Sequence, residues 1–420
     1  MRAFLHSDAT MPLRTLLQYG LPGFPLALLS LPVYVYVPQL YTASYGWSLT
    51  AIGLILLASR VADAFFDPWF GAWLDKQQHP ARFALTFALA TLPVNLGFWL
   101  LFHPLQTVPA ISLCAGLLLV YLGFSSATIA LQSWGAILGN SPQTRLQLTS
   151  AREFAGLCGV IIASLWTYWF SAAAVFQVLI ISCVLSVLAI WRLYRSHPAE
   201  TNHTNSQTAS SPRSLAIFQA DTTRHLYQSF ALNGIASAIP ATLFLFYAAD
   251  VLQRPDQAGL LLLLYFVCAV FSVPVWNWLG RRWHEARAWQ AGMWLAIASF
   301  STVCFLGAGD LLLFALVCAG SGFALGADLA LPSALLAGVI RQQQDSGQEG
   351  WYFGLWNWLS KMNLALAAGL AMPLLSLAGY APGRQDAQAV SALILAYAVL
   401  PCALKLLAWL RLYRSSLTTV

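Results

Sequence analysis

The chain has 420 residues, of which 59% are hydrophobic and only 9% are charged. The charged share is roughly a third of that of an average soluble domain, and no soluble fold hides so much apolar surface. The net charge of +6 does not indicate nucleic-acid binding, because the basic residues lie near the ends of apolar segments. The composition therefore predicts an all-α integral membrane protein, and the length leaves room for about twelve spanning helices.

Twelve apolar segments follow one another along the chain. They are expected at residues 13–42, 48–74, 82–103, 108–138, 147–170, 173–194, 224–251, 258–280, 286–308, 310–340, 350–378 and 388–412. A polar stretch rich in Ser, Thr, Asn and Pro separates the sixth segment from the seventh and cannot bury a core. We therefore expect a six-helix bundle over 1–195, a cytoplasmic linker over 196–222 and a second six-helix bundle over 223–420.

The N-terminal region predicts no cleaved signal peptide, because it lacks an apolar core that ends in a small-residue cleavage site. The first apolar segment contains several helix breakers, which are Gly20, Pro22, Gly23, Pro25, Pro32 and Pro38. Broken helices are tolerated within a membrane where they border a cavity rather than lipid. A bend is therefore expected in this first helix.

The distribution of basic residues predicts the orientation. Seventeen of the 21 Lys and Arg residues, Lys405 among them, lie on the side that holds both termini, and only Arg254 and Arg384 lie opposite. Lys and Arg stay in the cytoplasm during membrane insertion, so both termini and the linker are expected to be cytoplasmic. Arg60 and Lys361 are then the two basic residues left within the membrane.

The second segment carries three charges on one helix face. A charge at the bilayer centre costs at least about 2.5–3.5 kcal/mol, so each one needs a partner and a reason. Arg60, Asp63 and Asp67 follow at spacings of three and four residues. Two carboxylates one turn apart predict a site for Na⁺ or a proton, since either cation relieves their repulsion. The alternative is an internal Arg60–Asp63 salt bridge, with Asp67 as an anchor for helix packing.

Other charges lie in later segments. Lys361, in the eleventh segment, is at a depth close to that of the two aspartates and is their expected countercharge. It would stabilise the ion-free carboxylates and give way when the cation arrives, or else form a permanent ion pair between the halves. Asp328, in the tenth segment, would line the cavity or pair with a neighbour. Arg152 and Glu153 open the fifth segment, where cytoplasmic exposure costs little.

Aromatic and sulfur-containing residues carry weaker signals. Most of the 17 tryptophans are expected in interfacial belts or helix packing. Trp134, Trp356 and Trp358 share segments with unusual polar residues, and for these a cavity-facing position and a packing position are equally favoured. The seven cysteines lie in apolar stretches without CxxC pairs or nearby histidines, so they predict core packing rather than redox or metal chemistry.

Five stretches in both halves resemble one transporter family. They are Arg60-Val-Ala-Asp63-Ala-Phe-Phe-Asp67-Pro68, Ser133-Trp134-Gly135-Ala136, Thr144 to Glu153, Gly326 to Pro332, and Tyr352-Phe353-Gly354-Leu355-Trp356-Asn357 followed by Lys361. The chain is thus similar to the glycoside–pentoside–hexuronide cation symporters, the melibiose permease family of the major facilitator superfamily. The resemblance implies the major facilitator fold, with twelve transmembrane helices in two six-helix bundles related by a parallel repeat.

The resemblance also implies roles for residues. Asp63 and Asp67 would be ligands of the coupling cation, Na⁺, H⁺ or Li⁺, with Lys361 near the ion site. Arg60, on the same helix face as the aspartates, is a further expected countercharge. The candidates for solute binding are Trp134, Arg152, Asp328, Trp356 and Asn357. No metal site is expected beyond a possible Na⁺ at the two aspartates.

The chain also departs from the family pattern. The acidic residues that sugar-transporting members carry on helices one and four align with Ala27 and Ala130, so the usual grip on sugar hydroxyls is missing. An asparagine that precedes the second aspartate of helix two in the melibiose carrier is replaced here by Phe66. This weakens the case for Na⁺ as the coupling ion and leaves H⁺ as an alternative. The acidic residue after the helix-ten motif is replaced around Gly338 to Arg341.

These observations predict a cation-coupled secondary transporter of a glycoside, sugar or sugar acid that works by alternating access. It is expected to be a monomer in a bacterial plasma membrane, with a small-molecule solute and membrane lipid as partners, no nucleic acid, and no cofactor besides the coupling ion. No enzyme motif is present, so no catalytic residue is proposed. The alternatives are a carrier of a lysolipid or other amphipathic solute, and a non-transporting assembly or receptor protein on the same fold.

Overall fold

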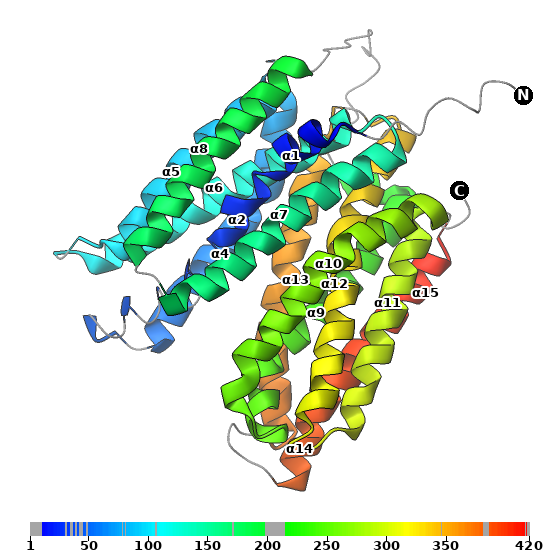
Figure 1. Cartoon of the computed structure of the whole chain (residues 1–420). Coiled ribbons are helices and arrows are strands. Elements are labelled where there is room, and N and C mark those ends of the chain that lie inside the picture. The colour runs from blue at the N-terminus through cyan, green and yellow to red at the C-terminus, as the bar shows by residue number, and fades with distance from the viewer. Residues whose placement is uncertain are drawn as a thin grey trace, which may run out of the picture.

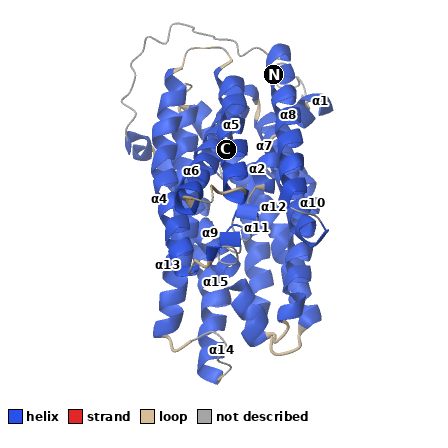
Figure 2. Cartoon of the chain, turned by 90° about the vertical axis from the view of Figure 1, so that its left-hand side faces the viewer, coloured by secondary structure: helices blue, strands red, loops and turns tan. Residues whose placement is uncertain are grey.

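A computed structural model gives the fold of the chain. It describes residues 11–29, 32–33, 37, 40–41, 45–47, 49–77, 79, 81–105, 107–169, 172–197, 215–345, 347–380, 386–415 and 417. Within these ranges every regular element is a helix (Figure 2). Residues 198–214 of the predicted linker lie outside the described part, so the domain boundaries there stay a prediction.

The helices follow the predicted apolar segments. The first half contains α1 (Leu13–Gly20), α2 (Gly23–Leu28), α4 (Leu49–Lys76), α5 (Arg82–Phe102), α6 (Pro109–Leu138), α7 (Pro142–Trp169) and α8 (Ala172–Ser196). The first segment is interrupted between α1 and α2, at the first of its prolines, Pro22, whereas Pro38 lies outside the described residues.

The second half repeats the pattern with longer helices and short irregular turns. It contains η2 (Leu215–Gln219), α9 (Asp221–Phe246), η3 (Tyr247–Val251), η4 (Pro255–Gln257), α10 (Ala258–Trp283), α11 (Glu285–Ser301), η5 (Thr302–Phe305), α12 (Leu311–Gln342), α13 (Glu349–Leu377), α14 (Ala387–Ile394), η6 (Leu395–Val399) and α15 (Leu400–Tyr413). The elements η3 and η6 are single π-turns that continue α9 and connect α14 to α15.

Eight stretches of the described chain are long and apolar enough to cross a membrane. They are Arg82–Phe102, Pro109–Leu138, Ala174–Ser196, Asp221–Val251, Pro255–Trp283, Glu285–Phe305, Leu311–Gln342 and Ala387–Tyr413. The helices α4, α7 and α13 are 28, 28 and 29 residues long and carry most of the charges singled out above. The eight apolar stretches are apolar all round and long enough to span a membrane. The charged faces of α4, α7 and α13 must instead be sheltered from lipid.

The helices form two bundles. Figure 1 shows α1, α2 and α4–α8 packed together on one side and α9–α15 on the other. The start of α1 and the end of α15 lie at the same end of the molecule, which we call the terminus side (Figure 1). The bundles meet mainly where α4 packs against α13 and where α7 packs against α10 and α12.

Glycines bring α4 and α13 into close contact on the terminus side. A Cβ on Gly71 of α4 would collide with the carbonyl oxygen of Gly350 at the start of α13. One turn further along, a Cβ on Gly354 would lie 2.6 Å from the carbonyl oxygen of Asp67. The two helix backbones therefore touch directly, which small residues permit at helix interfaces in membranes.

Charged side chains hold the same end closed. The carboxylate of Asp75 on α4 accepts hydrogen bonds from the backbone N–H groups of Gly350 and Trp351, both at 2.8 Å. Arg341 at the end of α12 donates to the carbonyl oxygens of Asn140 at 2.6 Å and Gly139 at 3.2 Å. The negative charge of Asp75 thus lies at the start of α13, and the positive charge of Arg341 lies at the end of α6. Both charges have the sign that the dipole of the contacted helix favours.

The Gly71→Val substitution is expected to open this contact. The added side chain has no space against Gly350, and overpacking of this kind costs about 1–3 kcal/mol. We expect a lower melting temperature and loss of solute uptake in vesicles. Gly307→Val is the matched control, because the nearest atom to a Cβ at Gly307 lies 4.0 Å away. Normal uptake by Gly71→Val would show that transport does not need α4 and α13 to approach this closely.

Candidate functional site

A buried ion cluster joins the two bundles. The Lys361 Nζ atom of α13 lies 2.6 Å from Asp63 Oδ2 and 2.7 Å from Asp67 Oδ2, both on α4. It also donates hydrogen bonds to Asp67 Oδ1 at 2.8 Å and to Ser125 Oγ of α6 at 2.7 Å. The Ser125 hydroxyl in turn donates to Asp63 Oδ1 at 2.7 Å. Two helices, α4 and α6, thus surround the ammonium group of a third helix, α13, with oxygen atoms.

The spacing of the aspartates explains how α4 presents them. Asp63 and Asp67 are four residues apart, so both carboxylates lie on the face that packs against α6 and α13. The neighbouring Phe65 and Trp69 are exposed, as expected of side chains that face lipid. Arg60, the other predicted countercharge, is half-buried on the same helix. The sequence therefore brings two acids to one protein-facing side of a membrane helix.

Burial differs between the acids and the base. The side chain of Asp67 is completely buried and that of Asp63 is 4% exposed, whereas Lys361 keeps 20% of its side chain exposed. The carboxylates are therefore sheltered while the lysine side chain remains partly accessible. The structure brings together Lys361, Asp63 and Asp67 as predicted, and it adds Ser125, which sequence reasoning missed.

The oxygen set around Lys361 suits a hard cation. Carboxylate and hydroxyl oxygens are the ligands that such ions prefer, and the ammonium group takes the central position between them. Among the described residues, no group of three or more His, Cys, Asp and Glu side chains could hold a metal ion. The cluster places two carboxylates and one hydroxyl around a single ammonium group, and these oxygens can hold a monovalent cation in place of that group.

The predicted solute-binding aromatic residues are packed in cores in this structure. Trp134 is 1% exposed within the hydrophobic core of the first bundle. Trp356 is buried in the second bundle and stacks on Phe230, with ring centroids 3.6 Å apart. Asn357, next to it, donates a hydrogen bond of 3.1 Å to Gln132 Oε1 across the bundle interface. The roles of these residues in solute binding stay predictions.

The expectation that Arg152 and Glu153 are exposed at a helix start is wrong for Arg152. Helix α7 begins at Pro142, five residues before the predicted start of the segment, so both residues lie well inside the helix. Arg152 is buried and forms an ion pair with Glu153, with Nη2 and Oε1 2.5 Å apart. The polar first turns of α7 conceal this part of the helix from a reading based on hydropathy.

Lys405 also differs from its expected place. It was assigned to the cytoplasmic basic residues, but its side chain is only 6% exposed and its Nζ atom lies 2.9 Å from Asp328 Oδ2. Lys405 donates a further hydrogen bond of 2.7 Å to Asn233 Oδ1. Of the two expectations for Asp328, cavity lining or pairing with a neighbour, the structure shows the pair.

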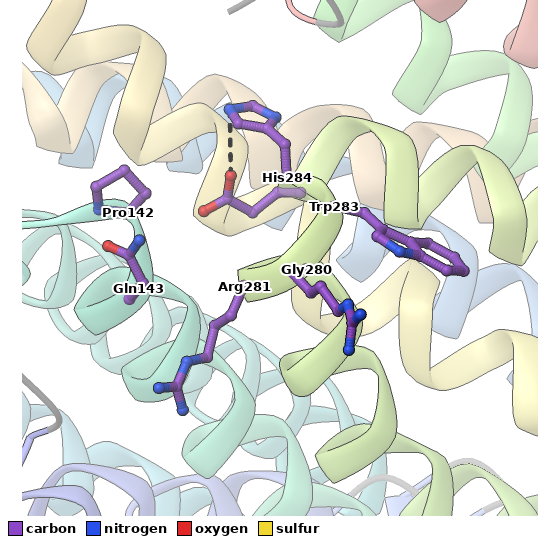
Figure 3. Close-up of a pocket in the computed structure, with 8 residues that line it drawn as sticks. Pro142, Gln143, Gly280, Arg281, Trp283 and His284 are labelled. Atoms are coloured by element: carbon purple, nitrogen blue, oxygen red, sulfur yellow. Dashed lines mark ion pairs between the residues drawn. The ribbon is translucent and has the colours of Figure 1, made fainter. Parts of the chain in front are cut away.

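A pocket of about 320 Å³ opens at the terminus side, away from the ion cluster. It lies between the start of α7 and the turn from α10 to α11 (Figure 3). Its lining consists of Pro142, Gln143, Gly280, Arg281, Arg282, Trp283, His284 and Glu285. His284 Nε2 lies 3.5 Å from Glu285 Oε2, and a dashed line from His284 in Figure 3 marks this contact. None of the predicted site residues belongs to this pocket.

Two bundles of membrane helices, joined by an ion cluster at their interface, define a transporter of the major facilitator superfamily. The chain belongs to the family described as MFS/sugar transport protein, which it matches over residues 18–419. The resemblance to the glycoside–pentoside–hexuronide symporters is thereby confirmed, and the family consists of transporters rather than enzymes.

Curated relatives match over part of the chain. The isoprimeverose transporter of Lactiplantibacillus pentosus is 29% identical over 163 residues, which is 35% of this chain and 31% of the relative. The sphingosine-1-phosphate transporter MFSD2B of Xenopus tropicalis is 22% identical over 161 residues, or 37% and 31%. These alignments cover less than a third of each relative's length.

Solved structures share the fold over nearly the whole chain. A bacterial homologue of the iron transporter ferroportin in an outward-facing state has a TM-score of 0.70 at 14% identity, covering 96% of this chain and 98% of that chain. The fucose:proton symporter FucP of E. coli has a TM-score of 0.66 at 15% identity, covering 94% and 98%. The human organic anion transporter MFSD10 reaches 0.65 at 18% identity, covering 96% and 100%.

Proposed function

We propose that this protein couples the transport of a small neutral solute to a monovalent cation, Na⁺ or H⁺. The observation that carries the proposal is the position of Lys361 Nζ, which lies among oxygen atoms of Asp63, Asp67 and Ser125. A cation that binds these oxygens must displace the ammonium group, because both cannot lie at the centre of one small cluster.

Displacement of Lys361 would link ion binding to movement of the bundles. Lys361 belongs to the second bundle and both aspartates belong to the first, so their ion pairs tie the bundles together. A cation held by the aspartates alone removes this tie. The ion can then shift the equilibrium between conformations by the difference in its affinity for them. Coupled transport by alternating access needs such a link between occupancy of the ion site and the conformation of the two bundles.

The closed terminus side supports an assignment of the conformation. The excess of Lys and Arg on that side favours a cytoplasmic position for both termini, in a bacterial plasma membrane. Contacts of Asp75 and Arg341 then close the cytoplasmic side, so this structure would be the outward-facing state. Rocking of the two bundles about the ion cluster would then open the cytoplasmic side and close the opposite side.

The proposed solute is a sugar or glycoside. The family description and the similarity to an isoprimeverose transporter favour this class. A lysolipid is the second candidate, favoured by the similarity to a sphingosine-1-phosphate transporter and by the alanines at positions 27 and 130. A non-transporting role is the least favoured, because Lys361 is partly accessible rather than sealed in its ion pairs.

Transport in proteoliposomes tests the proposal. Purified protein is reconstituted and given radiolabelled isoprimeverose or sphingosine-1-phosphate, with an inward gradient of Na⁺ or of H⁺ and with the ionophore that collapses each gradient. Accumulation of sugar above the equilibrium level, abolished by one ionophore, is expected. Accumulation that is equal with and without both gradients would disprove cation coupling. Accumulation of the lipid alone would replace the sugar by the second candidate.

A further inference from the structure

Asp328 lies at the centre of a polar cluster inside the second bundle. Its Oδ1 atom accepts a hydrogen bond of 2.9 Å from Trp289 Nε1 on α11. Its Oδ2 atom lies 2.9 Å from Lys405 Nζ on α15 and accepts a weaker hydrogen bond of 3.4 Å from Ser237 Oγ on α9. Lys405 is itself held by Asn233. Four helices of one bundle thus converge on a single carboxylate.

The donors around Asp328 hold its carboxylate in a fixed orientation. An ammonium group, an indole N–H and a hydroxyl each donate to one of its two oxygens. Tyr265 on α10 is close enough to interact with it electrostatically. The carboxylate oxygens therefore serve as hydrogen-bond acceptors.

Trp289 and Lys405 are more deeply buried than Asp328, with which they form contacts. Trp289 is completely buried and the Lys405 side chain is 6% exposed, whereas the Asp328 side chain is 12% exposed. Ser237 beside it is half-buried. The more accessible residues of the cluster are consequently Asp328 and Ser237, whereas Lys405 and Trp289 are more deeply buried.

Asp328 lies beside the interface of the two bundles. Leu325 precedes Asp328 by three residues and therefore lies on a neighbouring part of the same face of α12. Leu325 packs against the cluster that contains Leu157 of α7, in the first bundle. Asp328 also lies in the middle of α12, as Ser125 of the ion cluster lies in the middle of α6. The two polar clusters are thus at similar depth in a parallel repeat.

A structural ion pair alone does not explain this arrangement well. Replacement of a buried ion pair by packed apolar residues is often neutral or stabilising, so a retained pair is weak evidence for stability. Ionisable groups within a membrane protein more often mark a pathway for solute or ions. A carboxylate that is fixed by several donors and keeps part of its side chain accessible can accept hydrogen bonds from hydroxyl groups of a ligand but has no donor for a phosphate.

We propose that Asp328 and Ser237 bind hydroxyl groups of the transported solute, which is then a neutral sugar rather than a phosphorylated lipid. Lys405, Trp289 and Asn233 act as positioning residues that fix the carboxylate. This inference rests on the proposed transport function. It specifies the class of solute and names residues of the second bundle that take part in binding it. It assigns no role in ion binding to Asp328.

Binding measurements with defined probes test the inference. Binding of isoprimeverose and of sphingosine-1-phosphate is measured by thermal shift in the detergent-purified full chain, and the response to Na⁺ and to acidification is measured separately. A hydrogen bond to a charged group contributes enough that Asp328→Asn is expected to raise the apparent Kd for sugar by about 10- to 150-fold. Ser237→Ala is expected to raise it several-fold, and both variants should keep the wild-type ion response.

Further variants keep the test decisive if Asp328→Asn does not fold. Asp328→Asn combined with Lys405→Gln leaves no unpaired buried charge, and Ser237→Ala leaves the ion pair intact. An unchanged sugar Kd in a folded variant lacking the Asp328 carboxylate would overturn the inference while leaving the transport proposal standing. Binding of sphingosine-1-phosphate without binding of any sugar to the wild type would overturn both the inference and the proposed sugar. A lower melting temperature with an unchanged Kd would assign the cluster a purely structural role.

Discussion

Solute accumulation is expected to be abolished in the Asp63→Asn variant. Asp63 contacts both Lys361 and Ser125 and supplies one of the two carboxylate charges that face the ammonium group. Without that charge, Lys361 and Asp67 form a neutral pair that has little attraction for another cation. Uptake driven by a Na⁺ or H⁺ gradient in proteoliposomes should fall to simple equilibration of the solute. The same result is expected for Asp67→Asn.

The matched control for this experiment is Asp256→Asn. Asp256 lies in the exposed turn η4, so the substitution removes one carboxylate charge far from the bundle interface. We expect normal accumulation by this variant, and a single symmetric peak in size-exclusion chromatography for both. Undiminished accumulation by folded Asp63→Asn would show that Asp63 is not a ligand of the coupling ion.

The Lys361→Ala variant is expected to depend on the coupling ion for its stability. Removal of one partner from a buried ion pair costs about 3–5 kcal/mol, because the charge that remains has no compensation. In this protein two carboxylates would remain, one turn apart. A cation that binds them restores stability by mass action, by about 2.7 kcal/mol at a hundredfold excess over Kd.

Thermal denaturation with increasing Na⁺, or at decreasing pH, measures this effect. The melting temperature of Lys361→Ala should start below that of the wild type and rise more steeply with the ion, since the competing ammonium group is gone. Lys76→Ala is the control, because Lys76 lies exposed at the end of α4. A flat response of Lys361→Ala to both ions would indicate that the cluster binds neither.

The sequence was a good guide to the helices and a poorer one to their ends. Membrane helices are apolar all round, so hydropathy locates their cores without knowledge of the packing. The start of α7 was placed late because residues 142–146 are mostly polar. Arg145 in these turns donates a hydrogen bond of 3.3 Å to the carbonyl oxygen of Gly139, a tertiary contact that compensates for the polarity. Such compensation leaves no periodic pattern in the sequence.

The same distinction holds for the candidate site. Asp63, Asp67 and Lys361 could be found because charges in the middle of apolar segments are rare. Lys405 could not, since a lysine eight residues before the end of α15 is able to extend its side chain to the membrane surface. Only the packing of α15 against α9 shows that it instead contacts Asn233 and Asp328. Ser125 was missed because hydroxyl residues are common in membrane helices.

Two main-chain N–H groups of α13 donate hydrogen bonds to Asp75. Any residue other than proline at position 351 retains its N–H group, whereas position 350 requires glycine, because a Cβ there would collide with the carbonyl oxygen of Gly71 and lie 2.7 Å from Asp75 Oδ1. A search for second-site suppressors of a defective Asp75 variant should consequently yield few substitutions in the first turn of α13. Compensating mutations should instead arise where side chains meet, for example at Arg341 and Asn140.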